Sequence, residues 1–451
     1  MAGGKVIDKS IWRKALVIAL PLMLAESVDS ILWLMDTYFV SRLGDNALAA
    51  VGVGGYLGWL TFAGGSLFYT GALVLVAQAV GAGDKSAASK SSGEILTSNA
   101  LLGVPVLAAM WYLAPYLVEF IAGARVGYEV KMLSVEYYRA RLLGIPFTYA
   151  GLVLGAVYRG VGRTRPVLYA TLVFATVNGV LDPILIFGLL GVPPMGVAGA
   201  GYASSIANVV YAAILYAMAS RTVGFSVRPR PPGRYALTGA RIGFPALVER
   251  LAFVGGNVGY IGAVARCGEE ALAAHTVGVR VESIAFLPLF SIAEASAALA
   301  GQEVGAGRVP QAKRVGWEVA KLNALAGSIV MLVLVALSGY LPRIFTSTPS
   351  VVDLARLYLW IAGATEPALG VIMSIGMTIR GAGNTTVPTL VNLAGLYLLR
   401  VLPAGILPHY MPAGYCVLGA WLAMGIDVTG RGLAMVLVFR RYFERLARRV
   451  V

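Results

Sequence analysis

The chain has 451 residues, of which 58% are hydrophobic and 13% charged, and its mean hydropathy is +0.77. Soluble globular domains are nearer half apolar and a quarter charged, so this composition excludes a soluble protein and indicates a polytopic membrane protein. No nucleic-acid-binding motif accompanies the net charge of +14, and we expect that charge to reflect membrane topology.

Apolar runs long enough to cross a bilayer as helices fill almost the whole chain, whereas a transmembrane barrel would show weaker, alternating segments. The first run has no cleavage site of small residues before it, so we expect it to stay in the mature protein. The predicted fold is all-α, with twelve spans at about 12–41, 48–80, 94–122, 133–158, 166–190, 196–220, 238–265, 271–304, 318–342, 350–379, 386–408 and 413–439.

Basic residues are concentrated at both termini and in every second connection between the spans. The opposite connections contain only a few, namely Arg42, Arg125, Lys131, Arg266, Arg343 and Arg356. Because lysine and arginine are enriched in cytoplasmic connections, this asymmetry predicts that both termini are cytoplasmic.

The chain also contains an internal repeat. Four segments recur at a nearly constant distance along the sequence: ALPLMLAESVDS as GFPALVERLAFV, ALAA as ALAA, AQAVGAGDKSAA as GQEVGAGRVPQA, and YRGVGRT as IRGAGNT. The repeat predicts an N-terminal bundle at 1–220, a cytoplasmic linker rich in Pro, Gly and Arg at 221–237 and a C-terminal bundle at 238–451. An even number of spans separates the copies, so the repeat is parallel, and transporters built in this way have their site between or within the halves.

Charged side chains inside spans cost at least about 2.5 to 3.5 kcal/mol each and therefore need a partner, a water-filled cavity or a function. Asp36 lies in the first span, and Asn178 and Asp182 share one face of the fifth because they are four residues apart. Two carboxylates and an amide suit a hard cation such as Na⁺, and the same pair can hold a proton. The alternative is that Asp182 bonds a neighbouring helix around the Asp-Pro step.

Two further acids in the first span, Glu26 and Asp29, extend an acidic wall of the same cavity or pair with Arg139 or Arg141. The two cysteines, Cys267 and Cys416, are far apart in the sequence. We expect them to be small apolar side chains rather than a disulfide or a metal site.

At this point the chain resembles the multidrug and toxic compound extrusion (MATE) transporters of archaeal and bacterial type. The resemblance rests on LMDTYFVSRLGDNALAAVG, the two VGAG turns, RGVGRTRPVL, VNGVLDPILIFG and RGAGNTTVPTL, in this order and at this spacing. It implies a V-shaped pair of six-helix bundles, without enzymatic activity or a cofactor. Such a monomeric exporter of drug-like organic compounds works by alternating access in the cell membrane and exchanges them for Na⁺ or H⁺.

The resemblance also implies a cation site in the N-terminal half, made by Asp36, Asn178 and Asp182, to which a hydroxyl of the sixth span, Ser204, contributes. In the repeat, with a one-residue gap, Asp36 aligns with Tyr260, Asn178 with Arg400 and Asp182 with Ala404. We therefore expect a cation site in one half only.

The C-terminal half has polar residues of its own. Asp427 and Arg431, four residues apart, are expected to form an internal ion pair that Arg400 joins. Glu294 and Glu366 have no obvious partner in the sequence, and either is a candidate for a second cation or substrate contact.

Prolines stand at equivalent places in the two halves, Pro21 with Pro245 and Pro146 with Pro367. Each either bends its helix during transport or is a static kink.

Other functions are less well supported. A flippase for lipid-linked or amphipathic molecules of the same superfamily is the main alternative, but a pyrophosphate-linked lipid calls for a basic cavity rather than the acids of the first and fifth spans. A membrane enzyme is disfavoured because the two histidines have no catalytic spacing and no hydrolase motif is present. A channel is disfavoured because no filter-like segment interrupts the repeats.

Overall fold

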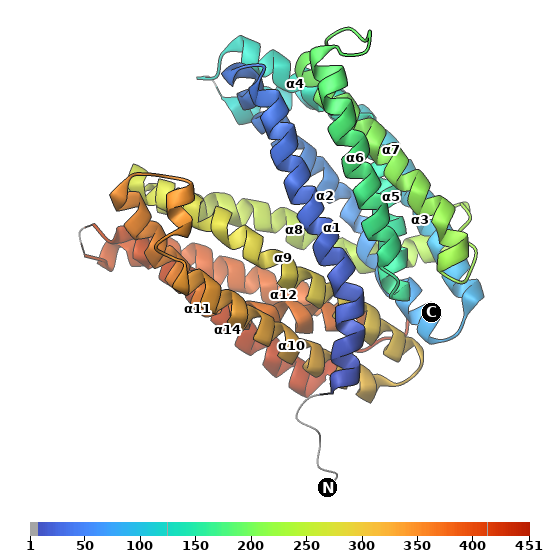
Figure 1. The fold of residues 1–451 in the computed structure, drawn as a ribbon. Coiled ribbons are helices and arrows are strands. Elements are labelled where there is room, and N and C mark those ends of the chain that lie inside the picture. The colour runs from blue at the N-terminus through green and yellow to red at the C-terminus, as the bar shows by residue number, and fades with distance from the viewer. Residues whose placement is uncertain (1–7, 124, 413) are drawn as a thin grey trace. The chain divides into compact units, whose positions relative to one another are not determined.

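The computed structural model describes residues 8–123, 125–412 and 414–451, and within these ranges every regular element is a helix (Figure 1). The first repeat contains α1 (Lys9–Ser41), α2 (Asp45–Gly81), α3 (Lys85–Ala122), α4 (Tyr128–Leu142), α5 (Ile145–Val161), α6 (Arg165–Phe187) and α7 (Gly196–Thr222). The second contains α8 (Arg234–Ala265), α9 (Glu269–Gly305), α10 (Val309–Ala336), η1 (Leu341–Ile344), α11 (Pro349–Gly381), α12 (Thr386–Ala394), the π-helix η2 (Gly395–Val401), α13 (Leu402–Ile406), η3 (Leu407–Tyr410) and α14 (Cys416–Leu446). The predicted all-α membrane fold is confirmed.

Within the described ranges, ten helices are long and apolar enough to cross a membrane, or eleven if α4 and α5 form one bent span. Twelve spans were expected, and the difference is α8. This helix has 32 residues, which is sufficient length, but Arg241, Glu249 and Arg250 lower its apolar character.

The expected single span at 133–158 is broken into α4 and α5, which meet at 51°. Between them, the backbone N–H of Gly144 donates to Ser205 Oγ at 3.0 Å, and Ser205 Oγ donates in turn to the carbonyl oxygen of Ala140 at 2.8 Å. A Cβ at position 144 would lie only 2.9 Å from Ser205 Cα. Glycine therefore permits the close approach, and the serine of α7 satisfies backbone groups that the break exposes.

The internal repeat is visible in equivalent hydrogen bonds. Asn99 of α3 and Asn323 of α10 are both fully buried. Each amide donates to carbonyl oxygens of the two neighbouring helices, those of Gly65 and Tyr149 for Asn99 and of Leu289 and Gly370 for Asn323. Two copies of one sequence motif thus make the same cross-link between three helices.

The described residues form two compact units, one of Pro21–Phe244 and the other of the residues up to Leu20 together with Pro245–Val450. The units change at Pro21 inside α1 and at Pro245 inside α8, which are equivalent positions in the repeat. Between the repeats, residues 226–233 form no helix and run against α3, where Ser89 Oγ donates to the carbonyl oxygen of Ser226. The boundaries at 220 and 238 stay a prediction.

Aromatic side chains fill the core of each repeat. In the second repeat Tyr358 and Trp421 are almost completely buried and meet edge to face with ring centroids 5.4 Å apart. In the first repeat Tyr138 and Tyr149 are buried, and their hydroxyl groups bond to the side chain and the carbonyl oxygen of Thr61. Buried hydroxyls are thus paired inside the protein, as a lipid-embedded core requires.

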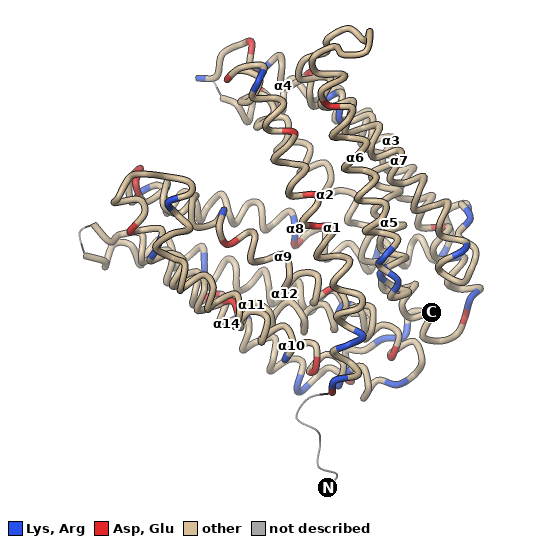
Figure 2. Tube along the Cα trace, viewed as in Figure 1, with Lys and Arg blue, Asp and Glu red and all other residues tan. Residues whose placement is uncertain are grey.

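Charged residues gather mainly at helix ends, and acidic positions along the middle of α1 are an exception (Figure 2). At one end of the second repeat, Arg314 pairs with Asp8 and Lys313 with Glu444, both at 2.9 Å. Asp8 precedes α1, and Glu444 lies near the end of α14. Both ends of the described chain are therefore at the same end of this unit, as an even number of spans requires.

At the other end of α14, Cys416 forms a disulfide with Cys267, and their Cα atoms are 5.5 Å apart. The expectation of two unpaired cysteines is wrong. The bridge joins residues 149 positions apart, because the turn between α8 and α9 meets the first residue of α14. Because the two cysteines are far apart in the sequence, their spacing does not indicate this contact.

We expect Cys267→Ser to lower the thermal unfolding midpoint in detergent. The bridge restricts the conformations of the unfolded chain and thereby stabilises the folded state by about 2 to 4 kcal/mol. Reduction of the wild-type protein should give the same decrease. The variant itself should not respond to reductant, and a variant as stable as the oxidised wild type would contradict a stabilising role.

Candidate cation site

The N-terminal polar residues meet where α1 faces α6. Asn178 and Asp182 project from one face of α6 and are 1% and 0% exposed. The amide group of Asn178 donates to Asp182 Oδ1 at 3.0 Å, which leaves its carbonyl oxygen as an acceptor. The two side chains thus form one polar unit inside an apolar helix.

Asp36 of α1 completes this unit. Its carboxyl group and that of Asp182 lie within hydrogen-bonding reach of each other. Asp36 Oδ1 and Asp182 Oδ2 are buried and have no hydrogen-bond donor among the described residues. The alternative in which Asp182 bonds a neighbouring helix around Pro183 therefore leaves one of its oxygen atoms unexplained.

Two facing carboxylates cannot both be charged without compensation. Like unit charges about 4 Å apart repel by about 4 kcal/mol at an effective dielectric constant of about 20. Arg141 of α4 acts electrostatically on Asp36, and Tyr137 accepts a hydrogen bond of 2.8 Å from its guanidinium group. One arginine offsets one carboxylate, so the group accommodates one further positive charge, either a proton or a small cation.

Gly58 leaves space for the side chain of Arg141. A Cβ on Gly58 of α2 would lie 3.4 Å from Arg141 Nε, so the guanidinium group passes directly over the glycine. In the second repeat, Glu282 is equivalent to Gly58 and Ala362 is equivalent to Arg141. The second repeat therefore has no arginine at the position of Arg141.

Ser204 of α7 is buried, but within the described chain its hydroxyl makes no hydrogen bond to Asp36, Asn178 or Asp182. Its neighbour Ser205 holds the break between α4 and α5. Of the two adjacent hydroxyls, Ser204 is therefore the one that is not committed to that break.

For Asp29 of α1, the sequence left open an acidic wall or pairing with Arg139 or Arg141. Asp29 experiences the charges of Glu26 and of Arg159 on α5. Arg139 instead donates to the carbonyl oxygen of Trp111, and Arg141 acts on Asp36. For Asp29, the arginine that acts on the carboxylate is therefore Arg159 rather than Arg139 or Arg141.

Arg159 also lies over an aromatic ring. Its guanidinium carbon is 5.7 Å from the ring centroid of Tyr69, and it acts electrostatically on Tyr211 of α7. Acids, an arginine and two tyrosines therefore line the first repeat next to Asp29. No spacing in the sequence points to Arg159, because α5 and α1 meet only in the folded bundle.

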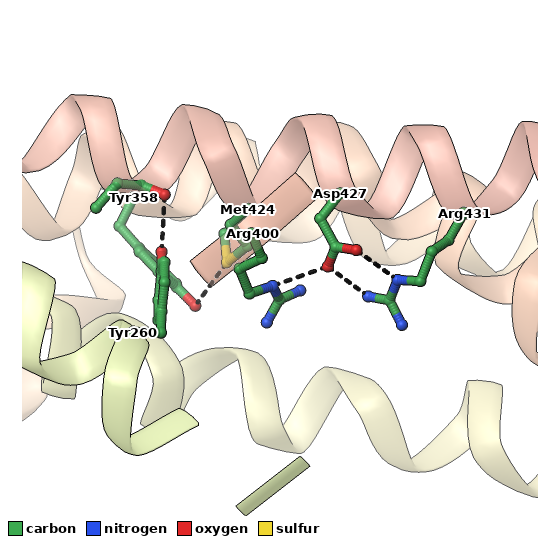
Figure 3. A network of polar contacts seen from close by, with 7 residues as sticks. Tyr260, Tyr358, Arg400, Met424, Asp427 and Arg431 are labelled. Atoms are coloured by element: carbon green, nitrogen blue, oxygen red, sulfur yellow. Dashed lines mark hydrogen bonds and ion pairs between the residues drawn. The ribbon is translucent and has the colours of Figure 1, made fainter. Parts of the chain in front are cut away.

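In the second repeat, the three residues grouped by the sequence as an ion-pair network lie together (Figure 3). Asp427 is fully buried and accepts hydrogen bonds from Arg400 Nε at 2.8 Å and from Arg431 Nε and Nη2, both at 2.7 Å. This carboxylate is already compensated by arginines and does not need a bound cation.

Glu249 of α8 is also fully satisfied. It accepts hydrogen bonds from Arg380 at 2.6 Å, Thr389 at 2.7 Å and Asn392 at 2.8 Å. The sequence signals for these contacts are weak, because α8, α11 and α12 are far apart along the chain.

Glu294 and Glu366 differ in their surroundings. Glu294 is 2% exposed and takes part in an interaction with another residue. Glu366 is 1% exposed, experiences the charge of Glu282, and has no hydrogen-bond donor to either carboxyl oxygen among the described residues. An isolated buried carboxylate is costly, so Glu366 is stable only when a proton or a cation neutralises it.

The described residues contain no group of three or more His, Cys, Asp or Glu side chains that could hold a metal ion. The group around Asp36 instead offers two carboxyls and an amide, all oxygen ligands. Such a set suits a singly charged hard cation or a proton better than a transition metal.

A comparison with known protein families divides the chain into the same two repeats. The MatE family model matches residues 21–184 and 245–406, one match in each repeat. The protein named "Probable multidrug resistance protein NorM" of Deinococcus radiodurans is 30% identical over 438 residues, which cover 94% of each chain. The protein of the same name from Thermotoga maritima is 29% identical over 436 residues and covers 95% of this chain and 92% of its own.

Solved structures agree on the fold. The Vibrio cholerae MATE transporter VcmN in its bent form has a TM-score of 0.88 at 19% identity and covers 97% of this chain and 98% of its own. A transporter of the MOP superfamily from Pyrococcus furiosus has a TM-score of 0.84 at 22% identity, with coverage of 98% and 100%. The chain therefore belongs to the MatE family and is a membrane transporter rather than an enzyme.

Proposed function

We propose that this protein is a secondary active multidrug antiporter, which exports cationic or amphipathic organic compounds in exchange for Na⁺ or H⁺. The names of the Thermotoga and Deinococcus relatives, "Probable multidrug resistance protein NorM", support multidrug export. One observation carries the coupling: Asp36 and Asp182 face each other and each has a buried oxygen atom without a donor among the described residues. The pair therefore gains stability when it takes up one positive charge.

In this proposal, filling of the site works through α1. A bound ion removes the repulsion between Asp36 and Asp182 and holds α1 against α6, and loss of the ion releases it. Since α1 belongs to one unit before Pro21 and to the other after it, a change in α1 is available to both units. Among solved structures of the same fold, one is described as a MATE in the bent conformation and another as a MATE in the straight conformation. These arguments support alternating access driven by the ion.

We place both termini in the cytoplasm. The excess of basic residues in alternate connections supports this orientation. The disulfide supports it as well, because Cys267 and Cys416 lie at the end of the second repeat that is opposite to the termini. That end would then face the oxidising exterior.

The accessory acids extend the proposal. Glu26 and Asp29, with Tyr69 and Tyr211 close to the same arginine, offer negative charge and aromatic faces to a drug-like cation. Glu294 and Glu366 are proposed as a second place for a proton or substrate. All ligands of the site around Asp36 come from one chain, so we propose that the monomer in the cell membrane is the working unit.

The decisive experiment imposes the two ion gradients separately on reconstituted vesicles. Export of the fluorescent cation ethidium should accelerate with a Na⁺ gradient at equal pH, or with a pH gradient in Na⁺-free choline buffer. Asp45→Asn, on an exposed position at the start of α2, is the matched control and should behave like the wild type. If neither gradient drives ethidium while a labelled lipid crosses the bilayer, the protein is a flippase and the proposal is wrong.

The adjacent serines of α7 give a matched pair. We expect Ser204→Ala to weaken apparent ion affinity about 5-fold without loss of stability, as for one neutral ligand worth about 1 kcal/mol. Ser205→Ala should remove the shorter of the two hydrogen bonds of Gly144 N–H, 3.0 Å against 3.3 Å to the carbonyl oxygen of Arg141, and cost about 1 kcal/mol of stability instead. Ion titrations and thermal unfolding of both variants distinguish these effects, and equal behaviour would remove Ser204 from the site.

A further inference from the structure

The π-helix η2 marks a length difference between the repeats. Before it, the two chains correspond: Gly160 lies against the backbone of Leu73, and its equivalent Gly381 lies against that of Ala297. By its last residue, Val401, the second repeat is one residue longer. In the first repeat, Gly179 faces Met35. In the second repeat, the residue equivalent to Met35 is Gly259, and it faces Val401. Without an insertion, the residue equivalent to Gly179 would be Arg400, so Val401 is one residue further along the chain.

A second contact gives the same displacement. Gly199 of α7 packs on the backbone of Leu185, and its counterpart Gly419 of α14 packs on that of Leu407. Since a π-turn holds more residues than an α-turn, the π-helix Gly395–Val401 accommodates the extra residue. This insertion brings Arg400 to the place equivalent to Asn178, and Tyr260 stands at the place equivalent to Asp36.

The surroundings of Arg400 are those of a cation site. Its guanidinium carbon is 5.7 Å from the ring centroid of Tyr260, and its Nε is 2.8 Å from Asp427 Oδ2. It also interacts electrostatically with Glu282, which accepts a hydrogen bond from Tyr358. Figure 3 shows the guanidinium group between Tyr260 and Asp427. An aromatic face and carboxylates thus enclose one positive group, whose side chain is 13% exposed.

Compensation of Asp427 does not by itself require this arginine. Arg431 already donates two hydrogen bonds of 2.7 Å to the two oxygens of Asp427. Arg400 therefore adds a second positive charge, which offsets Glu282. Without it, this part of the second repeat would have an excess of negative charge.

We propose that the guanidinium group of Arg400 is a built-in cation of the second repeat. It occupies the place equivalent to the one where the first repeat takes up its exchangeable ion, an inference that rests on the proposed function. The second repeat is then permanently in the ion-filled condition, and only the first repeat responds to the ion. A small monovalent cation should bind in the vacated place when the side chain is removed.

The test is chemical rescue in a background without the first site. In the variant Asp36→Asn/Asp182→Asn, Arg400 is further changed to Ala or to Gln, and Arg400→Lys is the matched control that keeps the charge. Thermal unfolding in detergent is followed with guanidinium chloride or NaCl at about 20 mM, far below denaturing concentrations, and with choline chloride as the ionic control.

We expect guanidinium to raise the midpoint of the Ala variant by about 2 to 5 °C, with a smaller rise in NaCl and none in choline chloride. The Lys variant should not respond. Recovery of folded Ala or Gln variant only when guanidinium is present during purification would also support the proposal. Folded Ala and Gln variants that show no cation-specific shift would overturn it, as would failure to recover either one even with guanidinium.

The two proposals fail in different measurements. With Arg400 intact, a stabilising effect of Na⁺ or of protons that survives Asp36→Asn/Asp182→Asn would remove the first site. The guanidinium response, in contrast, depends on residue 400 alone and is measured where the first site is already absent.

Discussion

Asp36→Asn and Asp182→Asn are each expected to slow ion-driven export of ethidium by about 10- to 100-fold. A change of this size is what the loss of a typical coupling free energy between two sites produces. Each substitution removes one carboxylate of the facing pair. In Asp182→Asn the remaining Asp36 is compensated by Arg141, and in Asp36→Asn the remaining Asp182 loses the like charge that faces it, so in both variants the need for a further positive charge decreases. The initial rate of export from vesicles, measured under the gradient that drives the wild type, reports the loss.

Substrate exchange without an ion gradient separates coupling from substrate binding. Both variants should still exchange labelled for unlabelled ethidium, and Asp45→Asn should retain the wild-type rate in both assays. Ion-driven rates that stay within about 2-fold of the wild type, against the 5-fold or larger effect expected of a coupling residue, would contradict the assignment.

Asp427→Asn is expected to have the largest effect on stability, a loss of about 3 to 5 kcal/mol. The aspartate is fully buried, and three hydrogen bonds from two arginines converge on it. The neutral amide leaves Arg400 and Arg431 as two buried positive charges with no carboxylate between them. Thermal unfolding in detergent, together with the yield of folded protein, measures this loss.

Glu444→Gln is the matched control for a carboxylate in an ion pair. Its partner is Lys313 at 2.9 Å, but the side chain of Glu444 is 60% exposed. Exposed pairs contribute no more than about 1 kcal/mol, so the control should be nearly as stable as the wild type. If the two substitutions have equal effects, the buried network does not stabilise the second repeat.

Long apolar segments made the helices predictable. Because every backbone group in a bilayer must be bonded within the protein, an apolar run of sufficient length has few alternatives to a helix. The repeat was predictable as well, since equivalent residues such as Asn99 and Asn323 make equivalent contacts. Helix α8, predicted as the span 238–265, is less apolar than a typical span because it carries charged residues such as Glu249, which is paired inside the protein.

Features that depend on contacts between distant segments could not be predicted. The break between α4 and α5 depends on Ser205 of α7. The pairing of Cys267 with Cys416 depends on where the α8–α9 turn meets α14. For Asp29, the acting arginine is Arg159, which is on a different helix from both arginines that the sequence suggested.

By itself, the sequence determined that this protein is an all-α membrane protein with two repeats, and it marked Asp36, Asn178 and Asp182 as costly residues in its spans. The helices and the costly residues follow from composition and periodicity, which are local properties of the chain, whereas the role as a transporter came from the resemblance of its motifs to a known family. Only the tertiary structure decided that Asp36 and Asp182 face each other and that a π-helix accommodates the extra residue which aligns Arg400 with Asn178. Both depend on the register of one helix against another, and register is set by close packing of side chains on glycines rather than by any single segment.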